Sequence, residues 1–360
     1  MLRNSFNRFF PIPRYLLAPS FGLDISDESL KFVGLVSVRD GIRIGRFGER
    51  AIPEGIIESG KIKDQKRLVE VLSLLRQRDG VRFVRVSMPE EQVYLFRLRL
   101  EKEGLENVRE GIELSLEEHV PIAAADSIFD YQILAEDSRS LELQVAAIQK
   151  SVVESYLSVF TDSGLSVGSL ELEAQAICRA VVRDGDMGTY MIVDFGQTRT
   201  GIFIISSGAA VFTSTLDIGG RALSGMIMKN FNVSLPEAEK MKKEYGLSRN
   251  AKNKEIFSVL LNTASVLRDE ISKHFLYWYT HKDEEGKSRP PIKKIILCGG
   301  DANLIGLSDY LSVSLKTKTE LADVWVNILE PGKSIPEIPK RRSLAFAAAL
   351  GLALGDFERD

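Results

Sequence analysis

The chain has 360 residues, which is enough for two domains of ordinary size, each able to bury a core. Apolar residues make up 44% and charged residues 27%, a globular composition that excludes a mainly disordered chain. Lys and Arg number 47 against 50 Asp and Glu, and this near-neutral balance argues against nucleic acid as a partner.

Cysteines and apolar runs indicate the compartment. The two cysteines, Cys178 and Cys298, both lie in apolar stretches, which favours core residues in a reducing compartment over a disulfide or a metal site. The longest apolar stretch, residues 345–355, is shorter than the ~20 residues that span a bilayer. The first 15 residues lack the continuous apolar segment of a signal peptide, so we expect a cytosolic protein.

The first part of the chain predicts a strand-rich unit followed by a small module. Strands are expected at 21–25, 30–38, 42–52 and 82–88, with a helix at 64–79 that Gly80 ends. Residues 92–149 then predict a βαββ module. In its first strand, 92–100, alternation places Tyr94, Phe96, Leu98 and Leu100 on one face.

The second part begins with a helix at 151–164, which we expect to open on a capping box at Ser151 and Glu154. A strand at 167–172 and a helix at 173–182 follow, and then strands at 190–195, 202–205 and 210–216. Helices are predicted at about 222–230, 235–245 and 255–280, the second of them with a capping box at Ser234 and Glu237. Strands at 294–298 and 324–328, a helix at 304–315 and a last helix at 343–354 complete the chain.

Two strand ends carry the same pattern, which predicts a phosphate site. Asp24 and Asp194 each end an apolar strand and precede a tight turn and a second apolar strand. Backbone N–H groups in such turns can approach phosphate oxygens, and Gly196 removes a side chain that would block them. The two carboxylates would act through Mg²⁺ and its waters, because they would repel phosphate directly. Their repetition indicates two related halves.

These motifs resemble a known superfamily. Residues 21–31 look like the first phosphate motif of the actin, sugar-kinase and heat-shock-chaperone ATPases, 192–201 like the second, and 296–302 like the adenosine motif. Within it, residues 22–355 resemble most the PilM family of type IV pilus assembly proteins. Supporting segments are Ser87-Met-Pro89, Glu118-His-Val-Pro121, Asp217-Ile-Gly219-Gly220, and Ala238-Glu239 with Lys242.

The resemblance implies an α/β, actin-like (ribonuclease H-like) fold of two lobes with an inserted βαββ module. The first lobe would comprise 20–88, 150–187 and 343–356, and the second 188–221 and 290–342. Residues 89–149 would form the inserted, SHS2-like module and 222–289 a helical subdomain, after a basic and aromatic extension at 1–19.

The resemblance also implies ATP or ADP with Mg²⁺ in the cleft between the lobes, with Asp24 and Asp194 toward the metal. The implied nucleotide-site residues are Asp24, Ser26, Ser29, Lys31, Asp194, Gly196, Gln197, Thr198, Thr200, Gly219, Gly220, Glu239, Lys242, Gly299, Gly300, Asp301 and Ala302. The chain departs from the superfamily at Ser26, where glycine is common, and Asp27 and Glu28 add negative charge. Glu171, Glu173 and Gln175 are the candidates to orient water, for ATP hydrolysis that is at most slow.

The implied partner is the N-terminal cytoplasmic peptide of a PilN-type inner-membrane protein, which would place this chain at the cytoplasmic face of that membrane. Other pilus platform or motor proteins and self-association are further partners to consider. The groove would lie between the inserted module and the neighbouring lobe. The Tyr94 to Leu100 stripe could line it, although such a stripe is more often core.

Two alternatives remain open. One is a cytoskeletal or cell-division scaffold of the FtsA or MreB type, although residues 355–360 contain no amphipathic anchoring helix. The other is a sugar or acid kinase, for which no substrate-side Asp base can be picked out. Polymer pelleting with ATP and product formation would distinguish them.

Overall fold

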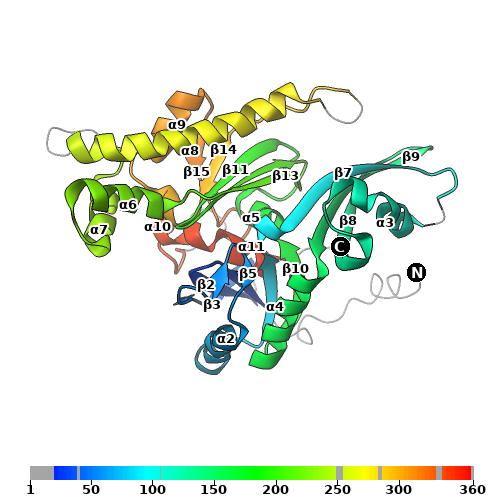
Figure 1. Cartoon of the computed structure of the whole chain (residues 1–360), viewed down its shortest axis with the longest axis horizontal. Coiled ribbons are helices and arrows are strands. Elements are labelled where there is room, and N and C mark those ends of the chain that lie inside the picture. The colour runs from blue at the N-terminus through cyan, green and yellow to red at the C-terminus, as the bar shows by residue number, and fades with distance from the viewer. Residues whose placement is uncertain are drawn as a thin grey trace.

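The first sheet is built from the opening hairpins of the chain. The computed structural model describes residues 20–38, 41–105, 107–248, 254–282, 286–329 and 335–357. Within these, β1 (Phe21–Ile25), β2 (Ser29–Val38), β3 (Gly41–Ala51), β6 (Phe83–Met88) and β10 (Ser166–Leu172) form one sheet in the order β10-β6-β1-β2-β3. Helices α2 (Gln65–Asp79) and α4 (Lys150–Ser163) pack together beside it (Figure 1). The short pair β4 (Ile57–Glu58) and β5 (Lys61–Ile62) adds a separate two-stranded ribbon.

The second sheet repeats this plan. Its strands are β11 (Thr189–Phe195), β12 (Thr200–Ser206), β13 (Ala209–Leu216), β14 (Ile295–Cys298) and β15 (Thr319–Leu321), in the order β13-β12-β11-β14-β15. As in the first sheet, the strand whose second-last residue is an aspartate pairs antiparallel with the next strand and parallel with a later one. The two sheets therefore present their first hairpin turns in equivalent positions.

A third sheet projects to one side of the molecule (Figure 1). Strands β7 (Val93–Glu101), β9 (Ser140–Gln149) and β8 (Ser127–Glu136) pair antiparallel in the order β7-β9-β8, and α3 (Val108–His119) covers one face. Ile112 and Leu116 of α3 are fully buried against Leu98 and Leu143. The predicted β-α-β-β order is confirmed. The helix lies where it does because the apolar face of β7 needs a cover.

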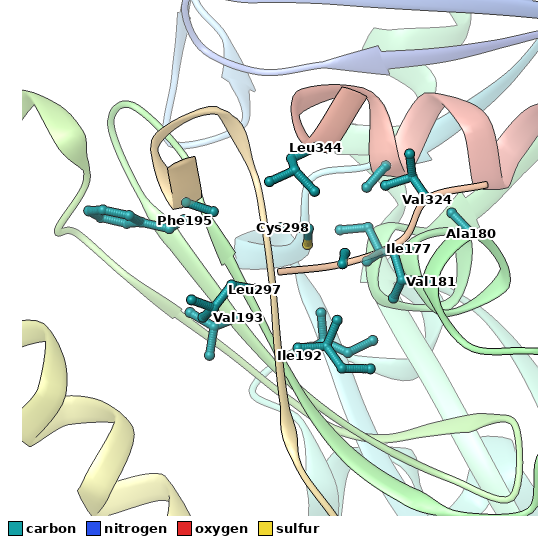
Figure 2. Close-up of a cluster of buried hydrophobic side chains, with 14 of the residues drawn as sticks. Ile177, Ala180, Val181, Ile192, Val193, Phe195, Leu297, Cys298, Val324 and Leu344 are labelled. Carbon is teal, nitrogen blue, oxygen red and sulfur yellow. The ribbon is translucent and has the colours of Figure 1, made fainter. Parts of the chain in front are cut away.

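Two helices with buried apolar side chains lie between the large sheets. α5 (Glu173–Val181) packs on α11 (Ala347–Leu354), which also contacts β1 and β2. The approach is so close that a Cβ on Gly351 would overlap the carbonyl oxygen of Ala176. Figure 2 shows Ile177 and Val181 of α5 in one core with Ile192 of β11 and Cys298 of β14. The α5 and α11 pair thus joins the halves into one packed unit.

The remaining helices gather at the second sheet (Figure 1). They are α6 (Gly220–Phe231), α7 (Leu235–Tyr245), α8 (Lys254–Thr280) and α9 (Leu307–Leu315), with the short α10 (Lys340–Ser343) before α11. The predicted capping box is present at the start of α7, where the Ser234 N–H donates to Glu237 Oε2 at 3.0 Å. In the part of the chain described, no helix is both long and apolar enough to cross a membrane.

Three expectations from the sequence differ from the structure. The strand predicted at 324–328 is wrong, since β15 lies at Thr319–Leu321 and the later residues turn back, with the Ile328 N–H donating to the Trp325 carbonyl oxygen. Val324 is buried all the same, and burial in a turn cannot be told from burial in a strand by hydrophobicity. The helix predicted at 304–315 starts only at Leu307, after the 3₁₀ turn η4 (Gly300–Asn303).

The capping box predicted at Ser151 is also wrong. α4 begins at Lys150 directly from β9, and Gln149 occupies its N-cap position without a side-chain bond. A continuous strand-to-helix passage leaves Ser151 inside the first turn, where its hydroxyl cannot cap the helix. The predicted extension at 1–19 lies outside the described residues. The predicted lobe and subdomain boundaries stay predictions.

Candidate functional site

The two hairpin turns face one cleft of about 710 Å³, a size typical of ligand sites. Ser26 and Gly196, from the first and second sheets, both line it. Thirteen predicted site residues line this cleft: Asp24, Ser26, Ser29, Lys31, Glu173, Asp194, Gly196, Gln197, Thr198, Glu239, Gly299, Gly300 and Asp301. Segments far apart in the chain are therefore brought to one place.

The first turn is held by serines rather than by glycine. The Ser26 N–H donates to the Ser29 carbonyl oxygen at 2.9 Å, and the Ser26 hydroxyl donates to the same oxygen at 3.0 Å. Lys31 Nζ donates to Ser29 Oγ at 2.9 Å. The departure at Ser26 therefore keeps a tight turn and adds hydroxyl groups to the cleft.

The second turn is supported from behind by a glycine pair. The Gly220 N–H donates to the Gly196 carbonyl oxygen at 2.9 Å, and a Cβ on Gly219 would overlap the backbone at Gln197. Neither Gly219 nor Gly220 lines the cleft, although both were predicted to contact the cofactor. Their lack of a side chain instead allows α6 to start against the turn.

Three more predicted contact residues lie behind the cleft wall. Thr200 is fully buried and its hydroxyl donates to the Ile218 carbonyl oxygen, while Ala302 is buried in η4. Lys242 is also buried, and its Nζ lies 2.7 Å from Asp301 Oδ1 and 2.9 Å from Glu239 Oε1. A buried cation requires such partners, and here they are two acids that do line the cleft. The structure thus assigns these three residues to its support.

Three partly buried acids lie in the lining of the cleft. Burial raises the pKa of Asp194 to about 6, with repulsion from Asp24 adding to the shift. Burial also raises the pKa of Asp24, and the nearby Lys31 opposes that shift. The pKa of Glu173 lies well above its usual value, first through burial and then through repulsion from Asp24 and Asp194. Once these three carboxyl groups ionise, their negative charges are not fully compensated.

This donor set fits Mg²⁺ held largely through water. A cation would relieve the repulsion that raises these pKa values, and carboxylate oxygens are its usual protein ligands. Across the described part of the chain, however, no three His, Cys, Asp or Glu side chains form a ready metal cage. Mg²⁺ commonly keeps several waters and takes phosphate oxygens, so one or two carboxylates are enough.

The extra acids of the first turn are neutralised from across the cleft. Asp27 Oδ1 lies 2.7 Å from Arg199 Nη2, and Arg199 also contacts Glu91. Glu28 pairs with Arg221 of α6. The repulsion expected of Asp27 and Glu28 is therefore balanced by arginines of the second half.

The structure places the three catalytic candidates in two different cavities. Glu173 lines the cleft, but Glu171 and Gln175 line a second cavity on the other side of the same segment. Glu171 accepts from Arg85 Nε and Arg179 Nη1, each at 2.9 Å, and the Gln175 side chain bonds the backbone at Gly208 and Ala210. The chain passes from strand to helix at Glu173, and this change of period separates the side chains.

This second cavity, of about 380 Å³, lies between the third sheet and the first, and we name it the module groove. Val93 and Leu95 of β7 line it, together with Ile128 of β8. The predicted stripe from Tyr94 to Leu100 is on the opposite face of β7 and does not line the groove. Leu98 and Leu100 are buried under α3, and the ring of Phe96 stacks on that of His119 with 4.6 Å between the ring centroids. Three of the four side chains of the stripe therefore belong to the core of the module, whereas Tyr94 is 39% exposed.

Comparison with known proteins now identifies the family. Residues 22–357 match the family model of type IV pilus assembly protein PilM. The chain belongs to the PilM family. Among solved structures, it is similar to a PilM-PilN type IV pilus biogenesis complex at 21% identity and a TM-score of 0.77, over 95% of this chain and 99% of that one.

Other relatives of this PilM-family chain agree on its fold. It is similar to the ethanolamine utilization protein EutJ of Carboxydothermus hydrogenoformans at 16% identity, over 95% and 93% of the two chains, with a TM-score of 0.56. MreB5 of Spiroplasma citri bound to ADP matches at 14% identity, over 91% and 94%, with a TM-score of 0.54. These likenesses confirm the predicted α/β, actin-like fold.

A curated relative is the cell division protein FtsA of Staphylococcus epidermidis, 21% identical over 213 residues. The match covers 53% of this chain and 44% of the relative, so the chain spans less than half the length of the curated relative that it matches.

The PilM-family cleft also contains residues that the sequence analysis did not assign to it. Arg199 and Glu91 line it, and so do Arg341 and Arg342 at the start of α10. Arg199 lies inside the second phosphate motif, a position that could have marked it. Arg341 and Arg342 precede the last helix far along the chain, and only the tertiary fold brings them to the cleft.

Proposed function

We propose that this PilM-family protein binds ATP or ADP between two lobes, each centred on one large sheet. The observation that carries this proposal is that the turns at Ser26 and Gly196 line one cleft above Asp24, Asp194 and Glu173. Backbone N–H groups of tight turns and the hydroxyls of Ser26 and Ser29 suit phosphate oxygens. That the similar MreB5 was solved with ADP supports a nucleotide as the ligand.

The acids of the cleft would work with Mg²⁺ rather than with phosphate directly. Mg²⁺ supplies the positive charge that lets a triphosphate lie beside carboxylates. Asp24 and Asp194 would hold its waters, and Lys31, the nearby cation, would offset the remaining charge. Among the predicted catalytic candidates, Glu173 alone lines the cleft. It would orient water for ATP hydrolysis that is at most slow.

The test of the nucleotide site is Asp194→Asn in the full chain. This substitution keeps the side-chain shape and removes the charge that would hold Mg²⁺. We expect Mg²⁺-ATP affinity, measured by calorimetric titration, to fall by roughly tenfold or more, as for a lost charge-assisted contact. Asp217→Asn, an exposed acid just after β13, is the matched control and should bind as the wild type does. Equal affinities in the two variants would refute the site.

We also propose that the module groove holds an extended peptide from a PilN-type membrane protein at the cytoplasmic face of the inner membrane. The support is the similar PilM-PilN complex, together with a groove whose apolar wall of Val93, Leu95 and Ile128 faces the ion pair of Glu171 and Arg179. Apolar pockets beside fixed polar groups suit a peptide with alternating side chains.

Two isoleucines of the same strand test the groove. Ile128 is 38% exposed and lines the groove, whereas Ile133 is 47% exposed on β8 and does not. Ile128→Glu should weaken binding of the partner's N-terminal peptide by at least tenfold, because a charge would enter an apolar site. Ile133→Glu should leave binding within twofold. If both variants bind equally well, the peptide does not occupy this groove.

A second candidate function is a cytoskeletal or division scaffold. The FtsA match over 213 residues and the likeness to MreB5 favour it. High-speed sedimentation with ATP distinguishes the two, since a scaffold should pellet as polymers and a peptide-binding platform component should stay in the supernatant unless it also self-associates.

A further inference from the structure

Arg199 has no role in the function proposed above, although it lies in the second phosphate turn and lines the cleft. We propose that Arg199 is a ligand of the terminal phosphate of the bound nucleotide and that, on binding, it exchanges Asp27 and Glu91 for that phosphate. This inference rests on the proposed nucleotide site and extends it by naming a side chain that binds the terminal phosphate.

The geometry places one guanidinium between three parts of the chain. Its backbone is fixed by the turn, because the Arg199 carbonyl oxygen accepts the Gly196 N–H at 3.0 Å. Its side chain is only 16% exposed, with Nη2 at 2.7 Å from Asp27 Oδ1 of the first turn. Nη1 contacts Glu91, which lies in the link between β6 and β7. A phosphate seated between the two turns would therefore lie within reach of this side chain.

Its present partners can release it. Asp27 does not depend on Arg199 alone, because its carboxylate also accepts the N–H groups of Ser59 at 3.1 Å and Gly60 at 3.2 Å. Glu91 itself lines the cleft, so water or a magnesium-bound water can replace the guanidinium there. In the structure, two carboxylates share one arginine. A terminal phosphate carries more negative charge than either carboxylate and can accept a bidentate pair of hydrogen bonds, which favours the exchange.

The other cations near the turns lack this combination. Lys31 donates a hydrogen bond to Ser29 beside the acids of the cleft. Lys243, Arg341 and Arg342 line the cleft with exposed side chains. Arg221 also pairs with an acid of the first turn, Glu28, but it is 46% exposed and lies outside the cleft lining. Arg221 is thus the matched control for Arg199.

The experiment is a double-mutant cycle on the full chain, read by calorimetric titration with Mg²⁺-ATP. Arg199→Ala should weaken binding by at least tenfold. Arg221→Ala removes a guanidinium that only offsets the charge of Glu28, so it should weaken binding by about threefold at most. Glu91→Gln removes one competitor for Arg199 while keeping its shape, so it should tighten binding about threefold to tenfold. In the Arg199→Ala background, Glu91→Gln should have no such effect, because there is no guanidinium to release.

Other results would overturn the inference. Tightening by Glu91→Gln to the same extent in both backgrounds would mean that Glu91 acts through plain repulsion of phosphate. If Arg199→Ala and Arg221→Ala bind Mg²⁺-ATP with equal affinity, Arg199 has only a structural role. If Arg199→Ala fails to fold, Arg199→Lys replaces it in the cycle, and its lost bidentate geometry should still weaken binding. If the wild type binds no nucleotide but still binds the partner peptide, the nucleotide site itself is wrong, and the role of Arg199 falls with it.

Discussion

At the scale of single residues, the cleft concentrates charge that the fold does not neutralise. Asp194 and Asp24 are partly buried and have raised pKa values. The pKa of Glu173 is raised by its own burial and further by repulsion from both of them. Carboxylates in such surroundings reduce stability unless a cation accompanies them, and groups perturbed in this way cluster at functional sites. We therefore expect the ionised acids to reduce the stability of the protein when no cation is bound beside them.

This loss of stability should depend on pH, and its direction follows from the raised pKa of Asp194. The folded state binds the Asp194 proton up to about pH 6, whereas the unfolded chain releases it near its ordinary value of 3.8. The stability from this proton is thus complete below about pH 4 and is lost as pH rises through 6. The free energy of unfolding of the nucleotide-free protein should fall between pH 4 and pH 7.

Asp194→Asn checks this prediction. Without the ionisable group, the variant should be more stable than the wild type at pH 8, by on the order of 2 kcal/mol, and should lose that advantage at pH 4. Urea unfolding at the two pH values measures the difference. An equal difference at both values would mean that the charge of Asp194 is not what destabilises the protein.

At the scale of elements, helix packing depends on glycines where backbones meet. Gly351 of α11 lies against the carbonyl of Ala176 in α5, while Gly225 on α6 has open space around it. Helix interiors otherwise disfavour glycine by about 1 kcal/mol relative to alanine. Close approach is therefore the physical reason for Gly351.

The two glycines form a matched pair for a test. Gly351→Ala should destabilise the protein by roughly 2–3 kcal/mol or prevent folding, because the new methyl group overlaps backbone atoms that cannot move away. Gly225→Ala should stabilise it by about 0.5–1 kcal/mol. Thermal unfolding of both variants measures these effects. A harmless Gly351→Ala would show that α5 and α11 do not approach as closely as described.

At the scale of the whole molecule, one short segment connects the cleft to the module groove. Pro89 and Glu91 line the cleft, and Val93, two residues later, lines the groove. Between them, Glu90 is buried and accepts the Ala174 N–H at the start of α5 with a distance of 3.3 Å. A change in cleft geometry would therefore be transmitted to the groove wall through residues 89–93.

Linkage makes this coupling measurable. Saturating Mg²⁺-ATP should change the affinity for the partner peptide severalfold, and the peptide must change ATP affinity by the same factor. Calorimetric titration in both orders tests the reciprocity, with Ile128→Glu as the variant that should lose peptide binding but keep ATP binding. Peptide affinity that is the same with and without ATP would contradict a nucleotide-dependent platform component.

The sequence was sufficient for features that depend on neighbouring residues. Apolar runs and turn signals predicted both hairpins, the βαββ module and the helices α2 and α7 to within a few residues. Asp24 and Asp194 were recognisable because each ends an apolar strand before a tight turn. Such patterns are local, so they survive without knowledge of the fold.

Only the tertiary structure decided which side chains face which cavity. It placed Glu173 in the cleft and Glu171 and Gln175 in the groove, and it turned Val93 rather than Tyr94 toward that groove. It also set Gly219 and Lys242 behind the cleft wall. These outcomes depend on contacts between segments more than a hundred residues apart, and a one-residue change in where a strand becomes a helix reverses the direction of a side chain.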